Sequence, residues 1–208
     1  MASERSISIV LASGSPRRQE LLARLGLPFE VCAADVDESP LPGEAAETLA
    51  RRLSLAKAHA VTPTRPRALI VAADTLVVVD QDVLGKPADE REAYTMLARL
   101  RGRAHHVLTG LALVDLARQR ESVEVVMTRV TMRDYSDAEI HRYIATGDPM
   151  DKAGAYAIQA TDLNPVAHIE GSYTNVVGLP LCALYRRLQA WGVPMPVDAR
   201  EACAQDGG

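Results

Sequence analysis

The spacing of apolar residues predicts strands and helices in alternation along most of the chain. An apolar run at 7–12 predicts a buried strand, and the turn at 13–15 joins it to a helix. Ser15 suits the N-cap of that helix, Pro16 its first position, and Gly26 its end. Further strands are predicted over 29–33, 68–73, 76–79, 104–116, 122–132 and 166–169. Further helices are predicted over 44–60, 89–101, 137–146 and 180–191.

The order of these elements predicts an α/β fold with a mixed sheet. Strands alternate with helices over most of the chain, but the two long strand-like runs at 104–116 and 122–132 follow each other directly. No repeat, low-complexity tract or long linker divides the sequence, so we expect a single domain over residues 1–192. Residues 193–208 are expected to form a loose C-terminal tail.

Composition and charge exclude several classes of protein. The 208 residues are 48% apolar and 24% charged, as in an average globular protein, and the net charge of -4 argues against a broad surface for nucleic acid. No segment approaches the roughly 18 apolar residues of a membrane span. The N-terminal apolar run is too short for a signal peptide, so we expect a cytoplasmic protein with no membrane partner. The three cysteines show no CxxC spacing, which supports neither a disulfide framework nor a zinc ribbon.

Arginine supplies almost all of the positive charge. Of the 23 basic residues, only Lys57, Lys86 and Lys152 are lysines. A lysine is a compact ammonium on a flexible stem, which suits contact with a phosphate as a point charge. Drift in codon usage is the alternative explanation of the three lysines.

The loop and helix start at 13–18 form the first candidate site. A helix N-terminus presents unpaired N–H groups and a partial positive charge, which Arg17 and Arg18 oppose. A bound anion would relieve that opposition, and the hydroxyls of Ser13 and Ser15 would add donors. The alternative is a capped helix with solvated arginines. The segment is neither a Walker A loop nor a GxGxxG motif.

Asp74 is the second candidate, because it interrupts an apolar run. An acid inside a buried strand is costly unless it is paired, metal-bound or hydrated. Such a carboxylate can hold a divalent cation or orient an attacking water, and a cap at a strand end is the alternative. Lys86 follows on a loop, in the tripeptide Gly85-Lys86-Pro87, which alone means little.

The segment DKAGAYAIQ at 151–159 is the third candidate. Its small residues allow a ligand to approach the backbone around Lys152, and the amide of Gln159 could bind a base edge. A tight surface loop is the alternative. Glu38, in an acidic loop, could add a carboxylate for a metal, although such a loop is more often only solvated. The histidines at 105–106 lack HExxH spacing and are expected to be structural.

Six segments in order are similar to the motifs of the Maf family: LASGSPRRQELLARLG, AADTLV, LGKP, the stretch from Met96 to Gly110, DKAGAYAIQ and GSYTNVVGLPL. They run from residue 11 to residue 181, so the resemblance covers nearly the whole chain. The resemblance implies a nucleotide pyrophosphatase that cleaves nucleoside triphosphates to the monophosphate and pyrophosphate with a divalent metal, Mg²⁺ or Mn²⁺. It implies an elongated mixed sheet flanked by helices, with two lobes around a central cleft, similar to inosine triphosphate pyrophosphatases.

The resemblance also implies roles for particular residues. Asp74 corresponds to the general base of the family, and Glu38 to an acidic residue near the metal or the water, so both are expected metal ligands. Residues expected to bind substrate through phosphate-facing cations or loop hydroxyls are Arg17, Arg18, Lys57, Lys86, Ser13 and Ser15. Residues at positions tied to substrate choice are Arg17, Thr75 and Gln159. Lys152 is expected to add a further cation.

Two segments, DKAGAYAIQ and GSYTNVVGLPL, resemble the branch of the family that acts on dTTP and UTP. Ala157 and Ala160 stand where glycine is usual, and their methyl groups lie near the expected base pocket. A nucleotide-sensing regulator of cell division and septum formation, with slow or incidental hydrolysis, is the alternative function. The apolar last helix could form a homodimer contact or belong to the core.

Overall fold

The computed structural model describes residues 7–204 and residue 206. Its described residues form a seven-stranded mixed sheet in the order β2-β1-β3-β5-β6-β7, with β4 paired to β3. The strands are β1 (Ile9–Leu11), β2 (Phe29–Val31), β3 (Leu69–Val79), β4 (Asp82–Leu84), β5 (Ala104–Asp115), β6 (Arg120–Met132) and β7 (Val166–Glu170). The helices are α1 (Pro16–Ala23), α2 (Ala46–Val61), α3 (Glu90–Leu100), α4 (Asp137–Ile144), α5 (Tyr173–Val177), α6 (Leu181–Ala190) and α7 (Ala199–Ala202).

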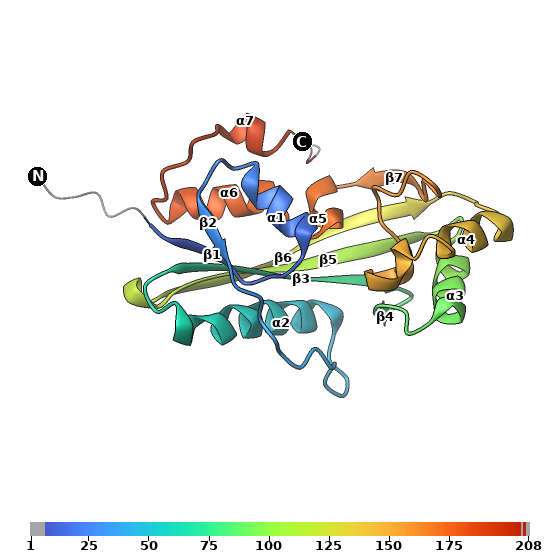
Figure 1. Ribbon diagram of the computed structural model, residues 1–208, viewed down its shortest axis with the longest axis horizontal. Helices are drawn as coiled ribbons and strands as arrows, with labels where there is room; N and C mark the ends of the chain where they lie inside the picture. The colour runs from blue at the N-terminus through green and yellow to red at the C-terminus, as the bar shows by residue number, and fades with distance from the viewer. Residues whose placement is uncertain (1–6, 205, 207–208) are drawn as a thin grey trace, which may run out of the picture.

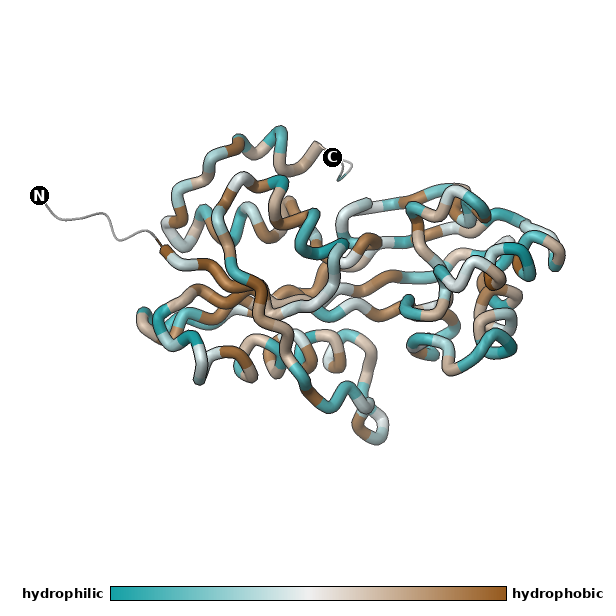
Figure 2. Tube along the Cα trace, in the orientation of Figure 1, coloured by the Kyte–Doolittle hydropathy of each residue, from teal (hydrophilic) through white to brown (hydrophobic). Residues whose placement is uncertain are grey.

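Helices cover both faces of an elongated sheet (Figure 1). The helix α2 lies on one face, α1, α6 and α7 lie on the other, and α3 and α4 lie at one end. Side chains along each strand point alternately to the two faces of the sheet. Leu11 and Val71 belong to the core under α1 and α6. Val10 and Ile70 pack on the other face, with α2. Figure 2 shows the hydrophobic residues concentrated in the central strands. No helix of the described residues is long and apolar enough to cross a membrane.

The pairing along β3 leaves part of one edge open. On that edge β1 pairs in parallel with residues 69–71, and β4 pairs antiparallel with residues 77–79. Among the described residues, no strand pairs on that side with residues 72–76 in between. The chain leaves β1 at this gap and enters the loop before α1. The open edge therefore brings side chains from both faces of β3 next to the start of α1.

The prediction of a mixed α/β sheet flanked by helices is confirmed. Strands β1, β2 and β3 pair in parallel, whereas the long pair β5 and β6 is antiparallel. The N-cap at Ser15 is also confirmed, although its side chain makes no capping bond, and the predicted helix at 137–146 begins with a capping box between Ser136 and Glu139. Gly26 follows α1 with a φ of 67°, in the left-handed region that glycine adopts without strain.

The structure differs from the expected strands and helices at three points, one of which is the short strand β4, which was not expected. The strand β3 continues through Asp74 and Thr75, which pair in register with Gly110 and Thr109 of β5. The acid does not break the strand because its carboxylate has a cationic partner, described below. The short helix α5 was not expected, because its five residues are too few to show helical spacing.

The expectations of no disulfide and of a loose tail are wrong. Cys182 in α6 forms a disulfide with Cys203, which follows α7 and lies 21 residues later in the chain. The carboxylate of Asp206 accepts hydrogen bonds from the backbone N–H groups of Thr174 and Cys182. Ala202 is buried in the core under α6. The tail folds back because it covers apolar surface and caps two helices, and CxxC spacing carries no information about such a pair.

Candidate functional site

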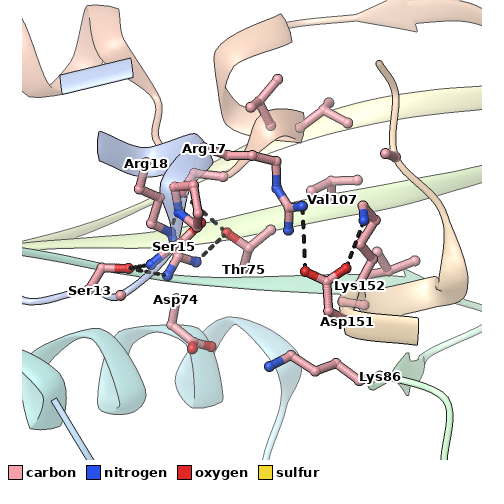
Figure 3. Close-up of a pocket in the computed structure, with 18 of the residues that line it drawn as sticks. Ser13, Ser15, Arg17, Arg18, Asp74, Thr75, Lys86, Val107, Asp151 and Lys152 are labelled. Carbon is pink, nitrogen blue, oxygen red and sulfur yellow. Dashed lines mark hydrogen bonds and ion pairs between the residues drawn. The ribbon is translucent and has the colours of Figure 1, made fainter. Parts of the chain in front are cut away.

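A cavity of about 450 Å³ lies at the open edge of β3, between the start of α1, the carboxyl-terminal half of α2 and the segment 151–159. Its volume is within the range of small-molecule sites. The residues that sequence reasoning assigned to the site all line this cavity: Ser13, Ser15, Arg17, Arg18, Glu38, Lys57, Asp74, Thr75, Lys86, Lys152 and Gln159. Figure 3 shows most of these side chains around the cavity.

Two neighbouring polar side chains of β3 point to opposite faces of the sheet. Asp74 points toward α2, where Lys57 lies, and Thr75 points toward α1 and Arg18 (Figure 3). This follows from the alternation of side chains along a strand. Both side chains reach one cavity because this part of β3 has an open edge.

Arg18, in the first turn of α1, is held in place by three neutral hydrogen-bond acceptors. Its guanidinium donates to the carbonyl of Gly178 at 2.9 Å, to Thr75 Oγ1 at 3.1 Å and to Ser13 Oγ at 3.3 Å. Burial lowers the pKa of Arg18, and the charge of Asp74 opposes this effect. No carboxylate of a described residue forms an ion pair with Arg18. Its charge is therefore fixed in place but not neutralised, at a helix N-terminus that also favours an anion.

A buried charge cluster lies on the other side of β3. The ammonium of Lys57 contacts Asp74 Oδ1 at 2.5 Å and Glu38 Oε1 at 2.7 Å. Lys57 and Asp74 are buried, at 8% and 5% exposure. Burial opposes ionisation of Glu38, but the hydrogen bond from Lys57 and the charges of Lys57 and Lys86 leave the pKa of Glu38 lowered. The cluster therefore keeps Glu38 ionised and orients the carboxylate of Asp74.

The other cations of the cavity differ in how far they are neutralised. Lys86 is exposed and forms no ion pair with any described residue. Arg17 has one distant partner, Asp151 at 3.8 Å. Lys152 is buried and donates to the carbonyl and carboxylate of Asp148 and to the carboxylate of Asp151, so its charge is already satisfied within the segment. Its expected role toward substrate stays a prediction.

One wall of the cavity is apolar and was only partly anticipated. Val77, Val107, Tyr156 and Ile158 line it, and the exposed amide of Gln159 makes no hydrogen bond to any described residue. Sequence reasoning singled out Gln159 but missed Tyr156, although both lie in the same motif. It also missed the carbonyl of Gly178, for which no side-chain pattern exists, and Asp151, which is the first residue of a quoted motif.

Asp74 and Glu38 fit a divalent cation as part of a shared site. Lys57 contacts one oxygen of each carboxylate, so Asp74 Oδ2 and Glu38 Oε2 have no hydrogen-bond partner among the described residues and are available to a cation. The described residues hold no group of three or more side chains that could ligate a metal. Mg²⁺ is commonly held by one or two carboxylates together with substrate phosphates and water, so two carboxylates are sufficient when a phosphate completes the set.

Comparison with known proteins places the chain in a family. The chain matches the family described as Maf-like protein over residues 8–191. It belongs to the Maf family. It is 52% identical to a dTTP/UTP pyrophosphatase of Myxococcus xanthus over 188 residues, which cover 90% of this chain and 94% of the relative. It is 50% identical to a dTTP/UTP pyrophosphatase of Geobacter sulfurreducens over 184 residues, covering 88% and 96% of the two chains.

The Maf assignment agrees with the order of motifs in the sequence. The matched region contains the full set of cavity residues, from Ala12 to Gly178. It ends at residue 191, before the segment that carries α7 and Cys203. The folded tail of this Maf protein therefore lies outside the part of the chain that defines the family.

Proposed function

We propose that this protein hydrolyses dTTP and UTP to the nucleoside monophosphate and pyrophosphate. The observation that carries the proposal is a single cavity in which the carboxylate of Asp74 lies near Arg18 and Lys86, two cations without an ion-pair partner among the described residues. A carboxylate beside unneutralised cations suits attack of water on a phosphate. The substrate class rests on the names of relatives that are about half identical over most of the chain.

In the proposed reaction, the oxygen of a water bonds to the α-phosphorus. The bond from that phosphorus to the oxygen bridging the α- and β-phosphates breaks, and pyrophosphate leaves with the electron pair. The proton of the water passes to Asp74. Lys57 holds Oδ1 of that carboxylate at 2.5 Å, and Oδ2 has no hydrogen-bond partner among the described residues, so Oδ2 is the oxygen that meets the water.

The cations of the cavity bind and stabilise the phosphates. Five basic side chains face three carboxylates there, so the cavity carries an excess of positive charge although the whole chain is acidic. Arg18 is fixed by three neutral acceptors and needs little rearrangement to meet a phosphate. Lys86 and Arg17 are free or nearly free to move onto the departing pyrophosphate, where negative charge develops.

A divalent cation, Mg²⁺ or Mn²⁺, held by Asp74 and Glu38 would neutralise and polarise the phosphate oxygens. Glu38 is suited to this role because Lys57 and Lys86 keep its pKa low. The carboxylates and Lys57 thus form the reaction side of the cavity. Arg17, Arg18 and the helix N-terminus form its phosphate side.

The base is proposed to lie against the apolar wall. Val107 and Tyr156 offer apolar surface, and the unpartnered amide of Gln159 can both donate to and accept from a pyrimidine edge. A free nucleotide is the whole ligand in this proposal, so neither nucleic acid nor a membrane is a partner. We expect the protein to act in the cytoplasm, where the nucleotide pool lies. The names of the relatives give no support to the alternative of a division regulator.

The test is pyrophosphate release from a panel of nucleoside triphosphates, with Mg²⁺, with Mn²⁺ and with EDTA. We expect metal-dependent release from dTTP and UTP with the monophosphate as co-product. Asp74→Asn should lower kcat at least about 100-fold while dTTP binding persists. Asp115→Asn is the matched control, because Asp115 is equally buried but lies outside the cavity, at the end of β5. Full activity of Asp74→Asn, or no release from any nucleotide by the wild type, contradicts the proposal. Molar mass in solution separately decides between a monomer and a homodimer, which the sequence leaves open.

A further inference from the structure

The wall segment, residues 151–159, lies outside the sheet and pairs with no strand among the described residues. It contains one 3-10 turn, Ala153–Ala155, in which Gly154 and Ala155 have φ values of 69° and 59°. Most of its residues line the cavity, including Tyr156 and Gln159. An irregular segment outside the sheet ladder depends on individual contacts for its position.

Three hydrogen bonds tie the wall segment to described residues outside the local stretch 148–160. The N–H of Gly154 donates to the carbonyl of Gly85 at 3.0 Å. The hydroxyl of Tyr156 bonds to His105 Nε2 of β5 at 2.7 Å. The N–H of Ala157 donates to the hydroxyl of Tyr143 at 3.1 Å. The first two partners lie in the loop after β4 and in β5, and the third comes from α4.

The hydroxyl of Tyr143 makes a second bond that closes the segment into a loop. It donates to Asp148 Oδ2 at 2.6 Å, while Asp148 Oδ1 accepts from Lys152 at 2.8 Å. One hydroxyl therefore holds the chain on both sides of Lys152, at Asp148 and at Ala157. Its donor and one acceptor position are both used, which fixes the direction of each bond.

Tyr143 itself lies in the core and not in the cavity. It is 1% exposed and packs with the apolar residues around α3 and α4. Because burial raises its pKa, the phenol stays protonated and remains a donor to Asp148. Any effect of this hydroxyl on a nucleotide must therefore pass through the wall segment.

We propose that Tyr143 is a positioning residue that sets the base-side wall of the cavity through its hydrogen bonds to Asp148 and Ala157. The proposal rests on the proposed function for the identity of the ligand. The phosphate side is held separately, since Arg18 is fixed by Gly178, Thr75 and Ser13. Loss of the hydroxyl should therefore weaken binding of the nucleoside part and leave the chemistry on the phosphates in place.

The test compares Tyr143→Phe with Tyr135→Phe. Tyr135 is also 1% exposed in the same core, and its hydroxyl donates to the carbonyl of Leu97 at 2.8 Å and forms no hydrogen bond with the wall segment. In Tyr143→Phe we expect KM for dTTP to rise about tenfold with kcat nearly unchanged. Inhibition by inorganic tripolyphosphate, which has no base, should keep its constant. Tyr135→Phe should leave KM unchanged although it loses a comparable hydrogen bond.

Hydrogen exchange of residues 151–159 without nucleotide gives a readout that does not depend on activity. It should become faster in Tyr143→Phe and not in Tyr135→Phe. If Tyr143→Phe does not fold, Asp148→Ala removes one of the two hydrogen bonds of the Tyr143 hydroxyl, together with one ion pair of Lys152, and should change KM and exchange in the same direction. Equal KM and exchange in Tyr143→Phe and wild type would overturn the inference. A wild type that hydrolyses no nucleotide would instead contradict the proposed function, and the exchange result would still decide the role of Tyr143.

Discussion

The disulfide between Cys182 and Cys203 should make a measurable part of the stability depend on the redox state of the solution. The two cysteines are 21 residues apart in the chain. In the chain-entropy description, a disulfide that closes a loop of that length lowers the conformational entropy of the unfolded chain and thereby stabilises the folded protein by about 3 kcal/mol. The reduced protein should lose that contribution. For a chain of this size, about 3 kcal/mol corresponds to a fall in Tm of about 6–12 °C.

The assay is thermal unfolding of the wild type and of Cys203→Ser, each with and without a reductant. Reductant should lower the Tm of the wild type to that of Cys203→Ser and leave the variant unchanged. Cys32→Ser is the control, because Cys32 is a free thiol in the structure, and it should respond to reductant as the wild type does. A wild-type Tm that does not respond to reductant, with the bond shown by mass to be formed, would refute the reasoning. The tail contacts of Asp206 would then carry the stability instead.

The remaining predictions concern packing, protonation and phosphate binding. Gly110→Ala should destabilise the protein by up to about 3 kcal/mol, because the added Cβ would lie 2.1 Å from the carbonyl oxygen of Ala50. Gly85→Ala is the control and should cost little stability, because a Cβ at Gly85 has no neighbour within 4 Å. Chemical denaturation measures the free energy of unfolding of both variants. Burial lowers the pKa of His105 to about 4, so between pH about 6.5 and about 4 the unfolded chain binds a proton that the folded protein does not. Stability should therefore fall as the pH falls through that window, by up to about 3 kcal/mol, and His105→Gln should flatten the slope. Lys86→Ala should raise KM for dTTP about tenfold or more, with less dependence on salt, since Lys86 has no ion-pair partner in the described part of the chain.

The sequence was sufficient to find the site residues whose side chains are unusual for their position in the chain. An acid inside an apolar run, two arginines at a helix start and three rare lysines all lie at one cavity. Each of these residues contradicts its local pattern, and such contradictions concentrate at functional sites. The alternating sheet positions of β3 then explain how Asp74 and Thr75 reach partners on opposite faces.

The sequence was insufficient where a role depends on contacts between distant segments. Lys152 is a different case, because Asp148 and Asp151, which satisfy its charge, lie only four residues and one residue before it, and sequence reasoning overlooked that local pattern. The carbonyl of Gly178 accepts a hydrogen bond from Arg18, which lies 160 residues earlier in the chain. Every residue has a backbone carbonyl, so the amino-acid sequence does not indicate which one makes this contact. The pairing of Cys182 with Cys203 likewise depends on how the tail folds back.

The placement of the three lysines has a practical consequence for chemical labelling. All of the lysines of the chain line the cavity at the open edge of β3, so every ε-amine of the protein reports on that cavity. Lys57 and Lys152 are buried in ion pairs at 8% and 7% exposure, while Lys86 is exposed. An amine-selective acylating reagent should therefore mark Lys86 before the other two lysines. Covalent probes and fluorophores can be directed to the cavity of the unaltered protein, with bound nucleotide as the protecting ligand.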